Sequence, residues 1–387
     1  MDIIKQFPQL SPEARANLME GPSMAPPPGV RSNLVNPVNS NSMAIVVLST
    51  CLCLSSITHA FRVYCRAMVI RVWRTEDYLG VLAFLCYVGF AVTLFLHAHY
   101  GGYLVHQWDI RLRFYQKVIQ VCMAYSLLFG FTMLFAKLAI LLEWKHIFVP
   151  EGRRSHFFWT SWSLIVLNII LFSMSIMAES FTCVPLRALW EPWVNGRCLD
   201  KKAIDLATAY LNLFIDMFIL ALPQTVIWKL QIVRNKKASI AAIFSIGGLS
   251  ILCAIIKIPF IHLLKYTGEG DTAYGISRIY LLTFTETTFA MLVFTVPAVP
   301  KGFSESCFGR HIMRSVRSCR RIGLLTKPGR TPTRIVSMES TGRTRLQRLT
   351  DKEYGGHGAQ FVPLESRFPQ EDNTKHGAET WWNRSPC

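Results

Sequence analysis

The sequence predicts an all-α membrane protein, a bundle of seven transmembrane helices followed by a disordered cytoplasmic tail. Apolar residues make up 51% of the 387 positions, charged residues only 17%, and the mean hydropathy is +0.30. A soluble protein of this length would place charges among its apolar residues every few positions. Here long charge-poor runs alternate with short polar breaks. This pattern excludes a disordered chain, a collagen-like chain and a disulfide-dense secreted module.

Three runs in the first part of the chain are long enough to cross a bilayer, because a helix needs about 20 mostly apolar residues to span roughly 30 Å of hydrocarbon. They lie at residues 42–61, 78–98 and 118–142, with the charged stretch 71–77 and the turn residues 101–102 between them. Each run must be a helix, because the bilayer core holds no water to satisfy free backbone groups. The alternation typical of a membrane β-barrel is missing.

Four further spans are predicted at residues 157–178, 206–230, 238–264 and 279–299. Segment 150–154, which contains proline, glutamate, glycine and two arginines, precedes the first of these four. Short segments rich in charge or glycine separate the others. The sequence therefore predicts seven spans.

The chain is predicted to contain an extracellular N-terminal tail, residues 1–41, and a membrane domain, residues 42–300. The tail lacks a basic segment followed by an apolar core and a small-residue cleavage site, so we expect no cleavable signal peptide. Cytoplasmic loops carry an excess of Lys and Arg. Loops after odd-numbered spans show this excess slightly, and the segment after the last span shows it strongly. We therefore predict a multi-pass protein of the plasma membrane, with the N-terminus outside and the C-terminus in the cytoplasm.

Residues 301–387 are predicted to form a basic, mostly disordered cytoplasmic tail, since they hold sixteen Lys or Arg, eight Asp or Glu and few aliphatic clusters. If its first part is helical, Phe308, Ile312, Met313 and Val316 share one face, and neighbouring arginines are free to meet lipid headgroups. The alternative is an unstructured polybasic segment. Because the net charge of +17 gathers in the loops and tail, we predict membrane lipids as partners and no nucleic acid.

Two of the eleven cysteines, Cys183 and Cys198, lie in the polar loop between the fourth and fifth spans. This loop is extracellular or lumenal in the predicted topology, where the environment is oxidising. A disulfide closing a loop of this size stabilises a fold by roughly 3 kcal/mol in the chain-entropy account. We therefore predict a disulfide between them, with two free thiols as the alternative.

Ionisable residues inside the spans are the best candidates for a site, because an uncompensated charge at the bilayer centre costs several kcal/mol. At about 1.5 Å per residue, Asp216, Lys257 and Glu286 all lie roughly 10–15 Å from the predicted outer ends of their helices. Asn212 shares a helix face with Asp216. One interpretation is a polar pocket, open to the outside, that holds a ligand or ion. The alternative is a structural pair of Lys257 and Glu286, with Asp216 solvated by trapped water.

Two other residues in the spans are assigned structural roles. Lys137 lies close to the inner end of the third span, so its ammonium is expected to extend toward the inner interface. Small and apolar residues on the same face favour helix packing there. Pro223 interrupts the fifth span, where a kink that serves packing is the common meaning.

Short motifs occur in a distinctive order along the chain. They are Glu76-Asp77-Tyr78, Ala136-Lys137-Leu138-Ala139-Ile140-Leu141-Leu142, Phe181-Thr182-Cys183-Val184-Pro185 with Trp190, Pro192, Gly196 and Cys198, then Leu222-Pro223, Trp228-Lys229-Leu230-Gln231 and Glu286. Together they resemble the fungal rhodopsin-like domain family of seven-span integral membrane proteins, often described as receptor-like, over about residues 43–303. The chain departs from that pattern twice. It lacks the eight-cysteine extracellular module of some relatives, and its last span ends in Val296-Pro297-Ala298-Val299-Pro300.

The family name suggests a light-absorbing pigment, which requires a lysine in the last span to form a Schiff base with retinal. Residues 279–299 contain no lysine, so we predict that the protein is not a retinal pigment. The third span ends in Glu143-Trp144-Lys145, which only loosely resembles the acidic-basic switch of G-protein-coupled receptors. The last span has no Asn-Pro-x-x-Tyr sequence.

The chain contains no phosphate-binding glycine loop, no His-Glu-x-x-His, no Gly-x-Ser-x-Gly and no paired-cysteine zinc spacing. We therefore predict no enzymatic activity, no cofactor and no metal site. The resemblance implies a receptor-like or sensor protein that binds an unknown extracellular small molecule and acts on a cytoplasmic signalling protein. The alternative is a transporter or an accessory membrane protein of a metabolic pathway.

Overall fold

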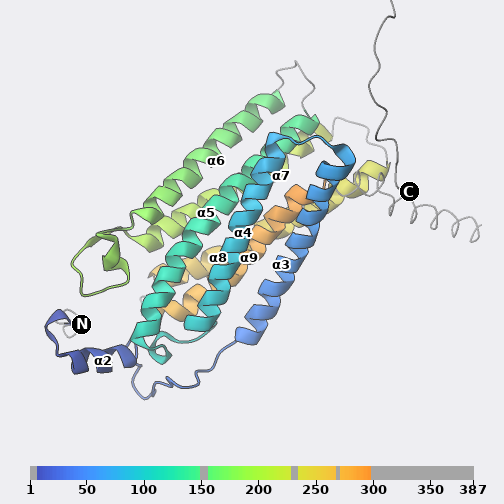
Figure 1. Cartoon of the computed structure of the whole chain (residues 1–387). Coiled ribbons are helices and arrows are strands. Elements are labelled where there is room, and N and C mark those ends of the chain that lie inside the picture. Colours follow the sequence, from blue (N-terminus) through green and yellow to red (C-terminus); the bar gives the residue numbers. More distant parts are fainter. Residues whose placement is uncertain (1–6, 149–155, 228–233, 267–270, 298–387) are drawn as a thin grey trace, which may run out of the picture. The chain divides into compact units, whose positions relative to one another are not determined.

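The computed structural model describes residues 7–148, 156–227, 234–266 and 271–297 (Figure 1). The chain divides into two units, residues 1–309 and 310–387, and every described residue belongs to the first. The predicted tail, residues 301–387, with its proposed amphipathic face, lies outside the described residues.

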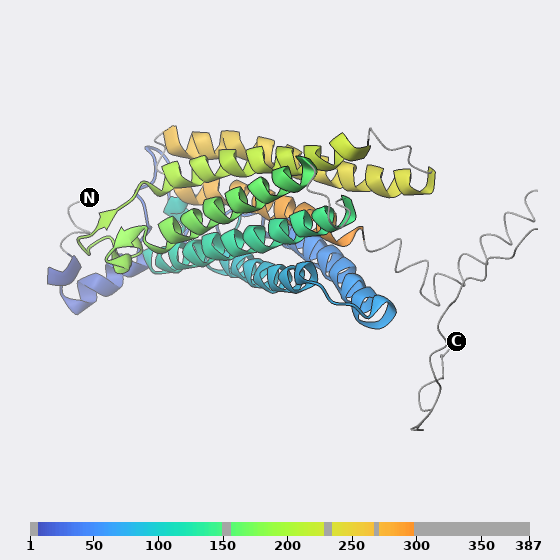
Figure 2. The same ribbon diagram turned by 90° about the horizontal axis from the view of Figure 1, so that it is seen from above.

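Long helices that run side by side make up most of the described chain (Figures 1 and 2). They are α3 (Asn41–Tyr64), which continues into a π-helical stretch (Cys65–Ile70), α4 (Thr75–Tyr100), α5 (Leu112–Phe148), α6 (His156–Ser180), α7 (Lys201–Ile227), α8 (Arg234–Tyr266) and α9 (Thr272–Thr295). Helices that follow one another in the chain pack together, and α9 also contacts α3, α4 and α5. Helix α9 therefore lies among the other helices.

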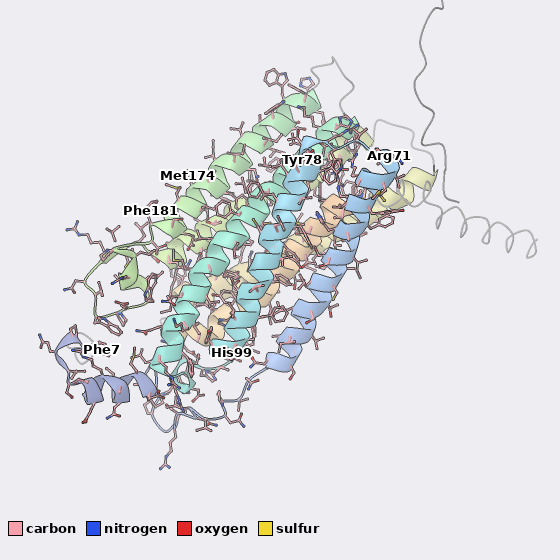
Figure 3. The ribbon with its side chains drawn as sticks, viewed as in Figure 1. Phe7, Arg71, Tyr78, His99, Met174 and Phe181 are labelled. Carbon is pink, nitrogen blue, oxygen red and sulfur yellow. A yellow bond between two sulfur atoms is a disulfide. The ribbon has the colours of Figure 1, made fainter. Side chains whose placement is uncertain are left out.

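Six of these helices, α3 to α8, are long and apolar enough to cross a membrane. Large apolar side chains are exposed on their outer faces, and Met174 of α6, labelled in Figure 3, is 68% exposed. A soluble protein would bury most of these side chains, whereas lipid solvates them. The chain is thus an all-α, multi-pass membrane protein.

The seventh predicted span corresponds to α9. This helix is not among the six that are long and apolar enough to cross a membrane. Its inward face carries polar side chains that are fully buried, among them Ser277, Glu286 and Thr287. Its bounds also differ from the predicted 279–299. The helix begins earlier because the Asp271 carboxylate caps its N-terminus through the Tyr274 N–H, and it ends at Thr295, just before Pro297.

The two ends of the bundle differ. At one end α4, α6 and α8 terminate and α3, α5, α7 and α9 begin; we call it the disulfide end. It carries a short antiparallel pair of strands, β1 (Cys183–Val184) and β2 (Arg197–Cys198), and the 3-10 helices η3 (Gln107–Asp109) and η4 (Leu186–Leu189). The opposite end holds the turn between α3 and α4, and we call it the α3–α4 end.

The described part of the N-terminal segment begins with two short helices. It contains the 3-10 helix η1 (Phe7–Gln9) and helix α2 (Pro12–Glu20), whose N-terminus is capped by Ser11. The Glu20 carboxylate bonds to Arg111 at 2.7 Å, and the Phe7 ring stacks on Trp193 at 4.0 Å. These contacts hold the segment against the disulfide end. The Ser-Pro-Glu sequence at residues 11–13 is a helix-start signal that could have predicted α2.

Candidate functional site

Four helices bring buried charges together in the bundle. The group consists of Lys137 from α5, Asn212 and Asp216 from α7, Lys257 from α8 and Glu286 from α9, and we call it the charge network. Each helix supplies its side chain from an inward face, between apolar residues that pack against neighbouring helices. Hence a contact in this network depends on the positions of several helices at once.

One half of the network is the pair formed by Lys137 and Asp216. The Lys137 ammonium lies 2.7 Å from Asp216 Oδ1 and donates to Asn212 Oδ1, also at 2.7 Å. Its side chain is only 1% exposed and lies over the Phe172 ring. The prediction that this ammonium extends to the inner interface is therefore wrong. The Asp216 carboxylate pairs with it inside the bundle, so the ammonium needs no contact with water.

The other half is the pair formed by Lys257 and Glu286. The Lys257 ammonium contacts Glu286 Oε2, and the two side chains are 4% and 0% exposed. This is the pair that the sequence analysis gave as the alternative to a polar pocket. The Ser250 hydroxyl donates to the Glu286 carbonyl oxygen at 3.3 Å, which ties α8 to α9 beside the pair.

Asn212 joins the two halves. Its amide nitrogen donates to Glu286 Oε1 at 2.6 Å and reaches Asp216 Oδ2 at 3.3 Å, while its amide oxygen accepts from Lys137. Asp216 thus has a cationic partner, and the expectation that water alone solvates it is wrong. Helix periodicity predicts that Asn212 shares a face with Asp216, but it does not predict the bridge to Glu286, because that acceptor on α9 is distant in sequence.

The network is electrically balanced, with two ammonium groups against two carboxylates. Its members are almost completely shielded from solvent, except for Asp216, whose side chain is 13% exposed. Paired and hydrogen-bonded charges of this kind are tolerated in a low-dielectric interior, whereas breaking one pair is strongly unfavourable.

A second buried group, which was not predicted from the sequence, lies toward the α3–α4 end. We call it the arginine cluster: Arg62 and Arg66, Asp77 of α4 and Glu143 of α5. Arg62 lies 3.0 Å from Asp77 Oδ1 and 2.9 Å from Glu143 Oε2, and it donates to the Phe294 carbonyl at 2.6 Å. One guanidinium thus connects α3, α4, α5 and the end of α9.

The sequence held a signal for the arginine cluster. Glu76 and Asp77 open the second span, and Glu143 closes the third, so three carboxylates stand near one membrane boundary. The arginines before the second span were interpreted as loop charges, yet Arg62 is only 2% exposed. The number of arginines in this segment supports a prediction of membrane orientation, but their ion-pair partners follow only from the packing of the helices.

Pro223, which was assigned a structural role, is buried inside α7, two turns beyond Asp216. Its neighbour Leu222 belongs to an apolar cluster with Ile215 and Ile219 of the same helix. The residue therefore lies in a packed part of α7, beside the charge network.

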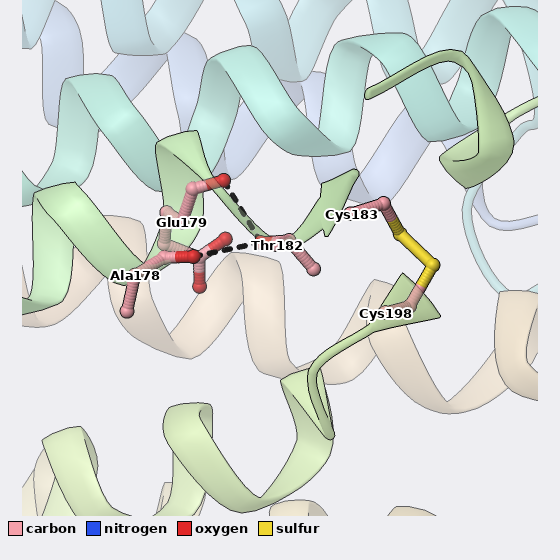
Figure 4. Close-up of a disulfide and its surroundings, with 5 residues drawn as sticks. All are labelled: Ala178, Glu179, Thr182, Cys183 and Cys198. Atoms are coloured by element: carbon pink, nitrogen blue, oxygen red, sulfur yellow. Dashed lines mark hydrogen bonds between the residues drawn. A yellow bond between two sulfur atoms is a disulfide. The ribbon is translucent and has the colours of Figure 1, made fainter. Parts of the chain in front are cut away.

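The Cys183–Cys198 disulfide is present, and the two cysteines face each other in the register of β1 and β2 (Figure 4). The Thr182 hydroxyl donates to the carbonyl oxygens of Ala178 and Glu179 at 3.0 and 2.8 Å, and it thereby fastens the loop to the end of α6. The predicted pairing is confirmed.

Replacing Cys183 and Cys198 with serine is expected to lower the stability of the protein by about 3 kcal/mol. The disulfide joins residues 15 positions apart, and without it the unfolded chain gains conformational entropy. Thermal unfolding in detergent measures the loss, and Cys53→Ser, at an exposed free cysteine, is the control. Mass spectrometry of non-reduced peptides should link the two cysteines. Alkylation of both without reductant would contradict the disulfide.

Comparison with known proteins places this chain among fungal membrane proteins. The fungal rhodopsin domain matches residues 61–305. The chain is 32% identical to "Fugralins biosynthesis cluster protein 2" of Gibberella zeae, over 89% of this chain and 85% of that protein. It is 24% identical to a "SAT4 family membrane protein" of Emericella nidulans, over 57% of this chain and 54% of that protein.

A shorter similarity, 26% identity over 32% of this chain and 46% of the relative, links it to "Satratoxin biosynthesis SC1 cluster protein 4" of Stachybotrys chartarum. No solved structure matches the chain. The domain match covers well over half of the chain and both buried charge groups. The protein belongs to the fungal rhodopsin domain family.

Proposed function

We propose that this protein is a receptor-like sensor that binds a small molecule and serves a biosynthetic pathway. The charge network carries the proposal, because it joins α5, α7, α8 and α9 through two ion pairs and one amide. Ionisable groups inside a membrane domain are costly and by default mark a functional site. A ligand that takes over one partner changes the packing of four helices, which is how binding at one place alters a distant surface.

The ligand class follows from the chemistry of the network. Asp216 is its most exposed member, and Asn212 is its one amide. A small molecule with a charged or strongly hydrogen-bonding group can replace one of these contacts. Two members of the network, Lys137 and Lys257, are the buried amines on which a retinal Schiff base would have to form, and both lie in ion pairs. This supports a sensor that is not a retinal pigment.

The names of two relatives support the pathway. Both are called biosynthesis cluster proteins, of the fugralins and of a satratoxin. The same observation favours a second candidate function, a transporter that moves a pathway compound across the membrane. For a sensor, the expected cytoplasmic partner is a signalling protein that contacts the loops of the α3–α4 end.

A thermal-shift screen tests ligand binding. The full chain, purified in detergent, is mixed with fractions of growth medium from the organism that expresses it, and a fraction that raises the unfolding temperature contains a ligand. The test variant is Asp216→Asn, which removes the most exposed carboxylate of the network and should lose the shift. Proteoliposomes then separate the two functions: saturable flux of the active compound indicates a transporter, and binding without flux indicates a sensor. Absence of any shift with every fraction would contradict both.

The proposed topology has α9 as the seventh span, the N-terminus and disulfide end outside, and the α3–α4 end in the cytoplasm of a plasma-membrane protein. Asn383-Arg384-Ser385 is the sole N-glycosylation sequon of the chain and lies in the C-terminal tail. It is expected to stay unmodified when the protein passes through the secretory pathway, because the tail does not enter the lumen. Glycosidase treatment followed by electrophoresis checks this. Glycosylation of Asn383 would show that the protein has the opposite orientation in the membrane.

A further inference from the structure

The turn between α3 and α4 has the side chains of a membrane boundary. Five large apolar or aromatic residues are exposed within fifteen positions of the chain. They are Tyr64, Met68, Val72, Trp73 and Tyr78. Tyr and Trp gather where hydrocarbon meets the lipid headgroups, because their rings are apolar and their tips are polar. The centroids of the Trp73 and Tyr78 rings lie 5.5 Å apart, so the two aromatic side chains are neighbours at this turn.

The arginines of this turn fall into two kinds. Arg62 and Arg66 are buried and neutralised by Asp77 and Glu143. Arg71 is exposed and forms no ion pair with any described residue. It lies at the α3–α4 end together with Tyr78 (Figure 3).

Arg74 resembles Arg71 more than the buried arginines. Its side chain is 38% exposed, and its guanidinium forms a long ion pair with Glu76 Oε1 at 3.8 Å. The buried pairs therefore engage Asp77 and Glu143, so Arg71 has no ion-pair partner among the described residues and Arg74 has only the long ion pair with Glu76.

A small cavity lies behind Trp73 and holds unused hydrogen-bonding groups. Its walls include His59, Arg62, Arg66 and Asp77. His59 is 4% exposed, and neither of its ring nitrogens has a hydrogen-bond partner among the described residues; the same holds for Arg62 Nε. Buried polar groups are nearly always partnered, so a free imidazole beside a cavity indicates a ligand or water that completes its bonds.

We propose that the α3–α4 turn binds the phosphate of an anionic phospholipid headgroup. Arg71 and Arg74 contact the phosphate, since a guanidinium forms paired hydrogen bonds with phosphate oxygens. Trp73 and Tyr78 lie against the glycerol and upper acyl region, and the cavity with His59 receives water bound to the headgroup. In the proposed topology this turn faces the cytoplasmic leaflet, where anionic lipids are enriched. The site does not depend on the proposed sensing of a small molecule.

The test measures binding of phosphatidylserine and of a phosphatidylinositol phosphate to the full chain. Native mass spectrometry counts lipids retained after release from nanodiscs that contain phosphatidylcholine with or without the anionic lipid. Each arginine near a membrane surface contributes about a fivefold factor in affinity for anionic lipid. The double variant Arg71→Gln, Arg74→Gln should therefore bind anionic lipid about 30-fold more weakly. It should bind phosphatidylcholine as the parent protein does.

The matched control is Arg187→Gln, Arg197→Gln, which removes two exposed arginines of the disulfide loop and should leave lipid retention unchanged. A phospholipid with a photoreactive diazirine on its upper acyl chain should crosslink to peptides within residues 64–78. Equal retention by the double variant and the parent protein would overturn the proposal, and so would crosslinks confined to the disulfide end. Competition by inorganic phosphate as strong as that of the lipid would show that the site takes a free anion instead.

Discussion

Replacing Lys257 with methionine is expected to destabilise the protein by roughly 3–5 kcal/mol. The substitution removes the ammonium that contacts Glu286 and leaves a carboxylate with a fully buried side chain. The amide of Asn212 still donates to Glu286, but an amide does not neutralise a charge. Chemical or thermal unfolding in detergent measures the loss. The control is Lys265→Met on the same helix, where a partly exposed pair with Asp200 at 3.9 Å should contribute less than about 1 kcal/mol.

The double variant Lys257→Met, Glu286→Gln separates a structural pair from a site that carries water. In a dry pair, removing both charges restores much of the lost stability, so the double-mutant cycle gives a large coupling energy. In a hydrated site, each single variant folds normally and the coupling is near zero. Near-zero coupling with an unchanged ligand response in both single variants would exclude the pair and the ligand site together.

Replacing Arg62 with methionine is expected to cost a similar amount, roughly 3–5 kcal/mol, because it removes the main cation between two buried carboxylates. Asp77 and Glu143 would keep only Arg66, which lies 3.1 Å from the first and 3.9 Å from the second. The Phe294 carbonyl would also lose its donor. Unfolding in detergent measures the effect, with the exposed Arg187→Met as control.

Arg62→Lys refines this second experiment. A lysine restores the charge but cannot present a planar fork to Asp77, Glu143 and the Phe294 carbonyl at once. The stability of this variant should lie between those of the parent protein and Arg62→Met. If Arg62→Met unfolds like the parent protein, the arginine cluster is hydrated and does not hold the α3–α4 end together.

The distribution of apolar residues alone predicted where the chain crosses the membrane. Six predicted spans correspond to α3 to α8, because the length of an apolar run must match the hydrocarbon thickness. Counting the rise along each helix placed Lys257 and Glu286 at one depth, and they form a pair. The spacing and compartment of Cys183 and Cys198 predicted their disulfide. These properties depend on distances along the chain, which a sequence contains directly.

The tertiary structure decided which faces meet. Lys137 was expected to reach the membrane interface, yet the packing of α5 against α7 places it beside Asp216. Arg62 was counted as a loop charge, yet it joins α3 to α4 and α5. Periodicity gives the face of one helix, but the rotation of a helix relative to its neighbours follows from side-chain packing along the whole contact. That packing is a property of the assembled bundle, and for this reason partners distant in sequence could not be assigned from the sequence.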